Sequence, residues 1–185
     1  MTMTDDILAW CKNYLEPKNK HLGNVPVCPY AKRARLGKTY RILECTNFAE
    51  FQDTIIEGAK IAKQKNVQIA IVACDDIGYT PEELDSVIDI LNRVLVPQDI
   101  YLMGSHPDDD EEEEDVDFLD TGEWQPEHNF MMVLIQKFDE LEKASDNLRK
   151  TGYYEHWPSD YYGETVLKRQ SYRRYRHGKK ISRSK

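Results

Sequence analysis

The chain has 185 residues, of which 40 % are hydrophobic and 31 % charged, a composition typical of one well-cored domain with a highly charged surface. No stretch approaches the ~20 apolar residues that a membrane-spanning helix requires, and the acidic start, 1–6, lacks the basic region of a signal peptide. We therefore expect a cytoplasmic protein without a membrane partner, whose thiols stay reduced. Its four cysteines, Cys11, Cys28, Cys45 and Cys74, match no zinc-finger spacing.

The net charge of −8 conceals a strong separation of charge along the chain. Residues 168–185 contain nine Lys or Arg and no acidic residue, which leaves 16 basic against 33 acidic side chains in the rest. Nine of the ten residues in 108–117 are acidic, and such a run repels itself and favours a solvated, disordered loop. The pattern predicts an acidic body with a basic tail.

Hydrophobic periodicity and capping signals predict the elements in chain order. Helices are expected at 5–15, 48–64, 80–96 and 139–151, and strands at 38–45, 68–74, 99–105 and 130–137. The alternation of strands and helices predicts an α/β fold with one four-stranded, mostly parallel sheet. Because no helix precedes the fourth strand, we expect that strand to be antiparallel.

The domain boundary follows from a change in composition after Gly152. We expect residues 1–152 to form the α/β domain, including the acidic loop 108–127. Residues 153–185 are first aromatic and then basic. We expect them to form an extension that ends in a disordered tail and is not a separate domain.

The stretch around Cys28 is the most specific in the chain. Pro29 suits the first position of a helix, which places Cys28 at the N-terminal cap, facing free amides. Together with the basic residues Lys32, Arg33 and Arg35 that follow, this environment is expected to lower the pKa of the thiol and to favour the thiolate.

Two short motifs carry a resemblance to a known family. Cys28-Pro29-Tyr30-Ala31 follows a short helix, and Ser105-His106-Pro107 closes the third predicted strand. Over about residues 7–150, the chain resembles an uncharacterised bacterial α/β family with a Cys-Pro-Phe-Ala motif and a His-Pro strand end. The resemblance implies the fold and the site but no reaction. Tyr30, the acidic run and the extension after 152 depart from the family pattern.

A weaker likeness is to glutaredoxins, whose motif is Cys-Pro-Tyr-Cys. Ala31 replaces the second cysteine here, which implies a monothiol mechanism at most. A glutaredoxin also needs a strand that leads into the cysteine. The segment 22–27 instead carries glycine and proline where a sheet needs amide donors.

Thiol, carboxylate and imidazole side chains lie at the carboxyl ends of the predicted strands, the edge at which open α/β sheets bind ligands. They include Cys45, Cys74, Asp75 and His106. If the Cys28 turn folds over this edge, Cys28 becomes a nucleophile, His106 its base and Lys32 an anion clamp. The expected substrate-binding residues are Arg35, Thr46, Asp75 and Asp76. Asp75 and Asp76 also suit a turn before Gly78. The pattern predicts a thiol-centred small-molecule site without specifying the reaction or the substrate.

Two further functions stay open at this stage. A zinc or iron ion bound by Cys45, Cys74 and His106, with Cys28 or Asp75, would make a metal-binding protein. Simple core packing of Cys45 and Cys74 is the competing interpretation, and it also suits Cys11. A third hypothesis is a non-enzymatic binding module whose tail contacts nucleic acid or an acidic partner. The tail residues in question are Tyr172, Arg173, Arg174, Tyr175 and Arg176. A solubilising tail and an internal contact with the acidic loop are its rivals.

Overall fold

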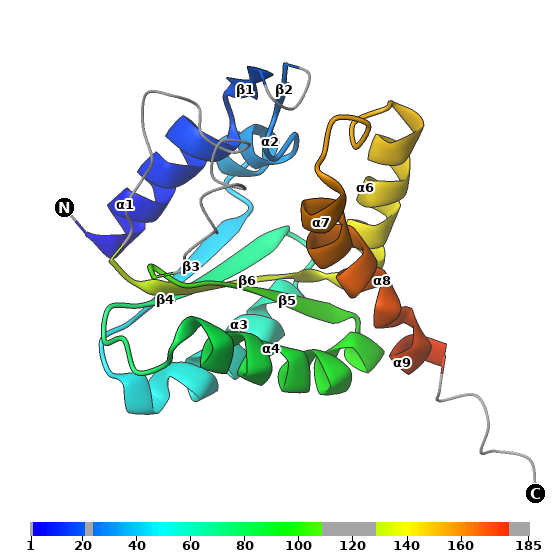
Figure 1. Ribbon diagram of the computed structural model, residues 1–185. Coiled ribbons are helices and arrows are strands. Elements are labelled where there is room, and N and C mark those ends of the chain that lie inside the picture. The colour runs from blue at the N-terminus through cyan, green and yellow to red at the C-terminus, as the bar shows by residue number, and fades with distance from the viewer. Residues whose placement is uncertain (1, 21–23, 109–128, 178–185) are drawn as a thin grey trace, which may run out of the picture.

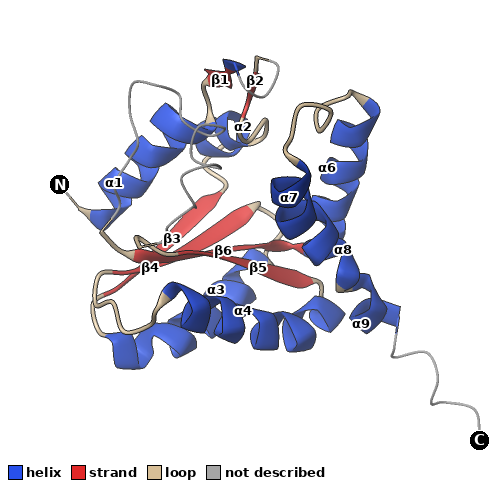
Figure 2. Ribbon diagram, viewed as in Figure 1, coloured by secondary structure: helices blue, strands red, loops and turns tan. Residues whose placement is uncertain are grey.

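The computed structural model describes residues 2–20, 24–108 and 129–177. Its centre is a four-stranded mixed sheet with helices on both faces (Figures 1 and 2). The strands are β3 (Tyr40–Cys45), β4 (Ile69–Cys74), β5 (Ile100–Ser105) and β6 (Met131–Lys137). They confirm the predicted α/β class and lie close to the predicted positions.

The prediction of a mostly parallel sheet is wrong, because two of the three strand pairs are antiparallel. The order is β3-β4-β6-β5, in which β3 and β4 are parallel and β6 is antiparallel to both of its neighbours. The last strand is antiparallel, as expected, but it is inserted in the middle of the sheet. Met131–Ile135 are buried throughout, and a continuous apolar run of this kind suits a central strand. The sheet therefore has one parallel pair.

One face of the sheet is covered by α3 (Phe51–Ala62) and α4 (Pro81–Leu95). Thr80 begins α4 with the predicted cap: its side chain accepts from the Glu83 amide, and Glu83 accepts from the Thr80 amide at 2.9 Å. The 3-10 turns η3 (Phe48–Glu50) and η4 (Val96–Gln98) precede α3 and follow α4. The larger of the buried clusters lies between these helices and the sheet.

The N-terminal segment covers part of the opposite face (Figure 1). Helix α1 (Met3–Trp10) continues in a π-helical turn, η1 (Cys11–Leu15), and Ile7 and Cys11 are buried against the sheet. A small ladder of β1 (Lys18–Asn19) and β2 (Val25–Pro26) follows, and then the short helix α2 (Ala31–Leu36). No described helix is long and apolar enough to cross a bilayer.

The C-terminal segment covers the remainder of that face. It comprises α6 (Phe138–Lys150), α7 (Ser159–Tyr162), the π-helical turn η5 (Gly163–Leu167), α8 (Lys168–Ser171) and α9 (Arg173–His177). Tyr172 is buried with Val96, Tyr101 and Phe138. The prediction of a disordered tail is therefore wrong for residues 168–177, because this part is helical and packed. Residues 178–185, and the acidic loop from 109 on, lie outside the described residues.

Candidate functional site

Helix α2 begins at Ala31 with Tyr30 as its N-cap, so the prediction of Cys28 as the cap and Pro29 as the first helical residue is wrong by two residues. The backbone amides of Tyr30 and Ala31 hydrogen-bond to the sulfur, and the Cys28 amide donates to Leu15 O at 3.0 Å. Burial nevertheless outweighs these amides and raises the pKa of the Cys28 thiol. The direction of this pKa shift is opposite to the one that the local sequence predicts. Lys32 is exposed, which leaves its charge in water.

His106 lies just beyond β5 and is only 4 % exposed. Its Nε2 lies 2.9 Å from Tyr79 O, and the Asp108 amide donates to its Nδ1 at 3.0 Å. A carbonyl can only accept and an amide can only donate, so Nε2 donates to Tyr79 O and Nδ1 accepts from the Asp108 amide. Both ring nitrogens are thus engaged by backbone groups. This geometry fastens the strand end and leaves no lone pair for a base.

Cys28 and His106 occupy opposite ends of the sheet. The Cys28 thiol interacts electrostatically with Tyr40, the first residue of β3, whereas His106 follows the last residue of β5. β3 and β5 run in the same direction in the sheet. The first residue of β3 and the last residue of β5 therefore lie at opposite ends of the strands. The structure does not bring the predicted nucleophile and base together.

The other predicted strand-end residues do share one edge. Cys45 and Cys74 lie opposite each other in the β3–β4 ladder, and Thr46, Asp75 and Asp76 follow them with exposed side chains. Asp76 accepts from the Phe48 amide at 2.8 Å, a turn-forming contact. Within the described ranges, no group of three or more His, Cys, Asp or Glu side chains is arranged to hold a metal ion. His106 is not grouped with the two thiols.

Much of the basic tail is directed at the body of the protein. Arg173 pairs with Glu142, Arg176 with Asp139, and the Tyr172 hydroxyl hydrogen-bonds to Asp89. Arg174 lies over the Tyr175 ring at 4.9 Å. Tyr172, Arg173 and Arg176 therefore make internal contacts with α4 and α6. A contact with the acidic loop falls outside the described residues.

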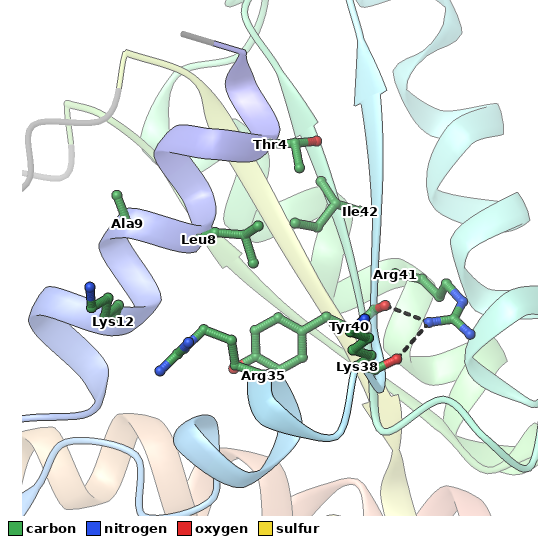
Figure 3. Close-up of a pocket in the computed structure, with 9 residues that line it drawn as sticks. All are labelled: Thr4, Leu8, Ala9, Lys12, Arg35, Lys38, Tyr40, Arg41 and Ile42. Atoms are coloured by element: carbon green, nitrogen blue, oxygen red, sulfur yellow. Dashed lines mark hydrogen bonds between the residues drawn. The ribbon is translucent and has the colours of Figure 1, made fainter.

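A hollow lies between α1 and β3 (Figure 3). We call it the α1–β3 hollow, and its volume is about 620 Å³. Its lining residues are Thr4, Leu8, Ala9 and Lys12 from the N-terminal helix, Arg35 and Lys38 from the end of α2, and Tyr40, Arg41 and Ile42 from β3. Figure 3 shows Leu8, Tyr40 and Ile42 directed into the space between the two elements. Lys12, Arg35 and Lys38 lie around this apolar floor, whereas the Arg41 side chain is directed to the other side of β3.

The four cationic residues of the lining differ in how they are held. Arg35 makes a two-point ion pair with Glu16, with nitrogen–oxygen distances of 2.5 and 2.8 Å. Arg41 donates to Lys38 O at 3.0 Å and to Tyr40 O at 2.7 Å. Lys12 and Lys38 are exposed and form no ion pair with any carboxylate that the structure describes. The lining itself contains no carboxylate, so Lys12 and Lys38 contribute positive charge to the hollow, while Glu16 balances the charge of Arg35.

Lys38 has an uncommon backbone conformation, with a φ of 52°. It is the left-handed residue of a Schellman turn that ends α2: the Thr39 amide donates to Ala34 O at 3.0 Å and the Lys38 amide to Arg35 O at 3.1 Å. Glycine is the usual residue at this position because it has no Cβ to clash. Here Gly37 stands one residue earlier, and a lysine occupies the strained position at the rim of the hollow.

Sequence reasoning named only Arg35 among the lining residues. The others come from an N-terminal helix and a strand far apart in the chain. The only local signal was the basic run from Lys32 to Arg41, with a glycine before Lys38. Comparison with protein-family models, curated proteins and solved structures found no match.

Proposed function

We propose that this protein binds a small organic anion with an apolar part in the α1–β3 hollow. The observation that carries the proposal is a rim of cations around an apolar floor, with one rim lysine held in a strained backbone conformation. A volume of about 620 Å³ suits a small molecule. The proposal keeps the predicted role of Arg35 in binding an anion and needs no catalytic thiol.

The cations at the rim suit a phosphate, sulfonate or carboxylate group. Lys12 and Lys38 reach the rim from opposite sides, one from the N-terminal helix and one from the turn before β3. Arg35 is fixed by Glu16, so its charge loses little further conformational freedom when an anion binds. Lys12 and Lys38 form no ion pair with a carboxylate in the described structure, and an anionic ligand between them would neutralise their charges.

The floor suits an aromatic or short aliphatic body. Leu8, Ala9 and Ile42 are apolar, and the Tyr40 ring lies between the two elements with its hydroxyl donating to Ala31 O at 3.3 Å. That hydrogen bond fixes the ring in place. A ligand with a flat or aliphatic portion removes this surface from water, which adds hydrophobic free energy to the electrostatic attraction.

The strained backbone of Lys38 supports a role for this residue in binding, because its conformation lowers the stability of the fold. A non-glycine residue in the left-handed region costs about 1 kcal/mol or more. Such strain is concentrated at functional positions because the folded structure must otherwise compensate for it. At this turn the strained residue is also the one that contributes a rim charge to the hollow.

The proposal is tested with three related probes: phenyl phosphate, inorganic phosphate and phenol. Titration calorimetry with the full chain is expected to give the tightest binding for phenyl phosphate, because only it has both an anion and an apolar part. The affinity is expected to fall as salt rises, since the rim charges are exposed. Equal affinity for phenol and phenyl phosphate would contradict the proposal.

Substitution of Lys38 separates binding from folding. Lys38→Gly is expected to raise the free energy of unfolding by about 0.5–1 kcal/mol, because it relieves the left-handed strain. It is also expected to weaken phenyl phosphate binding by about tenfold, the equivalent of 1.4 kcal/mol. Lys12→Gln is expected to weaken binding similarly. Lys65→Gln, which removes an exposed lysine outside the lining, is the matched control. If Lys38→Gly leaves the affinity unchanged, the hollow is not the site.

A further inference from the structure

Cys45 and Cys74 lie side by side at the ends of the parallel strands β3 and β4. They are register partners in the ladder, so their side chains leave the sheet on the same face. Both belong to the buried cluster under α3 and α4, where Cys45 is 4 % exposed and Cys74 is 0 % exposed. The fold thus places two thiols from segments 29 residues apart next to each other.

The surroundings of the two sulfurs are alike. The Cys45 thiol donates to Asn47 O at 3.1 Å, and the Cys74 thiol donates to Asp76 O at 3.4 Å. Each sulfur therefore lies where its strand turns away from the sheet. The last hydrogen bond between the two strands joins Asp75 N to Cys45 O at 3.4 Å.

We propose that Cys45 and Cys74 form an oxidation site that a hydroperoxide converts to a reversible intramolecular disulfide. Neighbouring strands lie about 4.8 Å apart, within the range of about 4.4–6.8 Å between the Cα atoms of disulfide-bonded cysteines. The bond joins two strand ends that are already neighbours. The site is independent of the α1–β3 hollow.

The reaction balances with one equivalent of hydrogen peroxide. Cys45 is the more exposed of the two residues. Its sulfur attacks one peroxide oxygen, the O–O bond breaks, and the products are a sulfenic acid and water. The Cys74 sulfur then attacks the Cys45 sulfur, the S–O bond breaks, and the released hydroxide takes the Cys74 proton to form a second water. Two thiols lose two electrons, and the peroxide is reduced to two waters.

The geometry favours a slow and reversible bond. Burial raises the pKa of Cys74 to about 12, so this thiol keeps its proton until the sulfenic acid has formed next to it. The strands must also draw together, because a disulfide brings its Cβ atoms to about 3.5–4.5 Å. Strain of this kind makes a disulfide easier to reduce with a small thiol.

Oxidation also removes two hydrogen bonds from the turns beyond the strands. The thiols no longer donate to Asn47 O and Asp76 O, and Asp76 in turn holds the Phe48 amide. The Phe48 ring packs edge-on against Tyr79, with centroids 4.6 Å apart. The disulfide is therefore expected to loosen this aromatic pair.

Peptide mapping of the full chain decides the proposal. Trypsin separates the four cysteines into four peptides, 1–12, 21–32, 42–60 and 66–93. The folded protein is treated with hydrogen peroxide, alkylated, digested without reductant and analysed by mass spectrometry. We expect a cross-linked pair of peptides 42–60 and 66–93 that dithiothreitol separates. A Cys11–Cys28 cross-link alone, or Cys45 oxidised to sulfinic acid without a cross-link, would overturn the proposal.

Two variants complete the test. Cys45→Ser is expected to abolish the cross-link and to leave Cys74 as a free thiol, because its partner is missing. Cys28→Ser, the matched control, is expected to leave the cross-link intact. The result in the unmodified chain stands by itself if a variant folds poorly. Cross-linking that persists in Cys45→Ser would show that Cys74 pairs with a different thiol and would refute the assignment.

Discussion

The Cys11 side chain is completely buried beneath α1, where the Tyr40 hydroxyl hydrogen-bonds to it. Burial raises the pKa of Cys11 to about 11, although the Tyr40 contact lowers it in part. An unfolded thiol has a pKa of about 8.5, so the folded state binds this proton more tightly than the unfolded state. The stability contributed is complete below about pH 8.5 and is lost as the pH rises toward 11.

This difference predicts a dependence of stability on alkaline pH. Between pH 7 and 10, Cys11 is expected to reduce the free energy of unfolding by about 2 kcal/mol. Urea denaturation at both pH values measures the loss, which should be smaller by about that amount in Cys11→Ala. Val67→Ala, which removes buried atoms without a titrating group, should lose stability but retain the full pH dependence. An unchanged dependence in Cys11→Ala would contradict the assignment.

At the residue scale, the local hydrogen bonds of Cys28 were predictable from the sequence, whereas its burial and the position of the hollow were not. The amides next to Cys28 follow from local spacing, and the structure contains them. Burial of the sulfur depends on distant segments: the Tyr153 hydroxyl, for example, hydrogen-bonds to Pro26 O and Val27 O. The strain at Lys38 is equally hidden, because Gly37 is the residue that local rules would place in the left-handed conformation.

Within the C-terminal segment, α6 is the helix to which α8 and α9 are attached by ion pairs. Glu142 on this helix is 7 % exposed, and it pairs with Arg169 of α8 at 2.6 Å and with Arg173 of α9. Arg169 is itself 5 % exposed. A buried charge of this kind is tolerated only while its partner is present. The ion pairs therefore set the position of α8 and α9 on α6.

Removal of Glu142 is expected to be strongly destabilising. Glu142→Ala leaves the Arg169 charge buried and unpaired, at a cost of about 3–5 kcal/mol in the free energy of unfolding. Glu140→Ala is the matched control, because its ion pair with Lys137 is exposed and is worth at most about 1 kcal/mol. Urea denaturation compares the two variants.

A double substitution distinguishes the charge from the packing. Glu142→Leu with Arg169→Leu is expected to recover most of the lost stability, since an apolar pair of similar volume needs no partner. Equal stability losses in Glu142→Ala and Glu140→Ala would show that the buried pair does not hold the helices.

At the element scale, the helices and strands of the body were predictable because each carries its own signals. The Thr80-Pro81 cap and the apolar faces of α3 and α4 are examples. The order of the strands was not predictable in the same way, because pairing joins residues far apart. The continuous burial of Met131–Ile135 was the available signal for a central strand.

The whole molecule is completed by residues that composition assigns to an extension. The Tyr172 side chain is 3 % exposed against Val96, Tyr101 and Phe138. Tyr153 contacts the segment before Cys28 through its hydroxyl group. The C-terminal segment thus covers apolar surface of the α/β body and also reaches the N-terminal region. Residues on both sides of the predicted boundary at 152 therefore pack against each other.

Truncation after residue 152 tests this integration. Loss of Tyr172 alone removes a buried aromatic ring, a change that typically costs about 3 kcal/mol or more. The shortened chain is therefore expected to unfold at a much lower urea concentration and to associate through the exposed Tyr101 and Phe138 surface. Size-exclusion chromatography and denaturation measure both effects. A truncated chain that stays monomeric and equally stable would show that 1–152 is an independent domain.

The insertion of β6 between β4 and β5 has a consequence for how the nascent chain acquires its structure. Within the described sheet, β5 is hydrogen-bonded to β6 alone, and β6 is synthesised after it. While residues 131–137 remain inside the ribosome, β4 and β5 expose unpaired backbone edges, which are prone to aggregation. The sheet closes from its middle only when this last strand emerges.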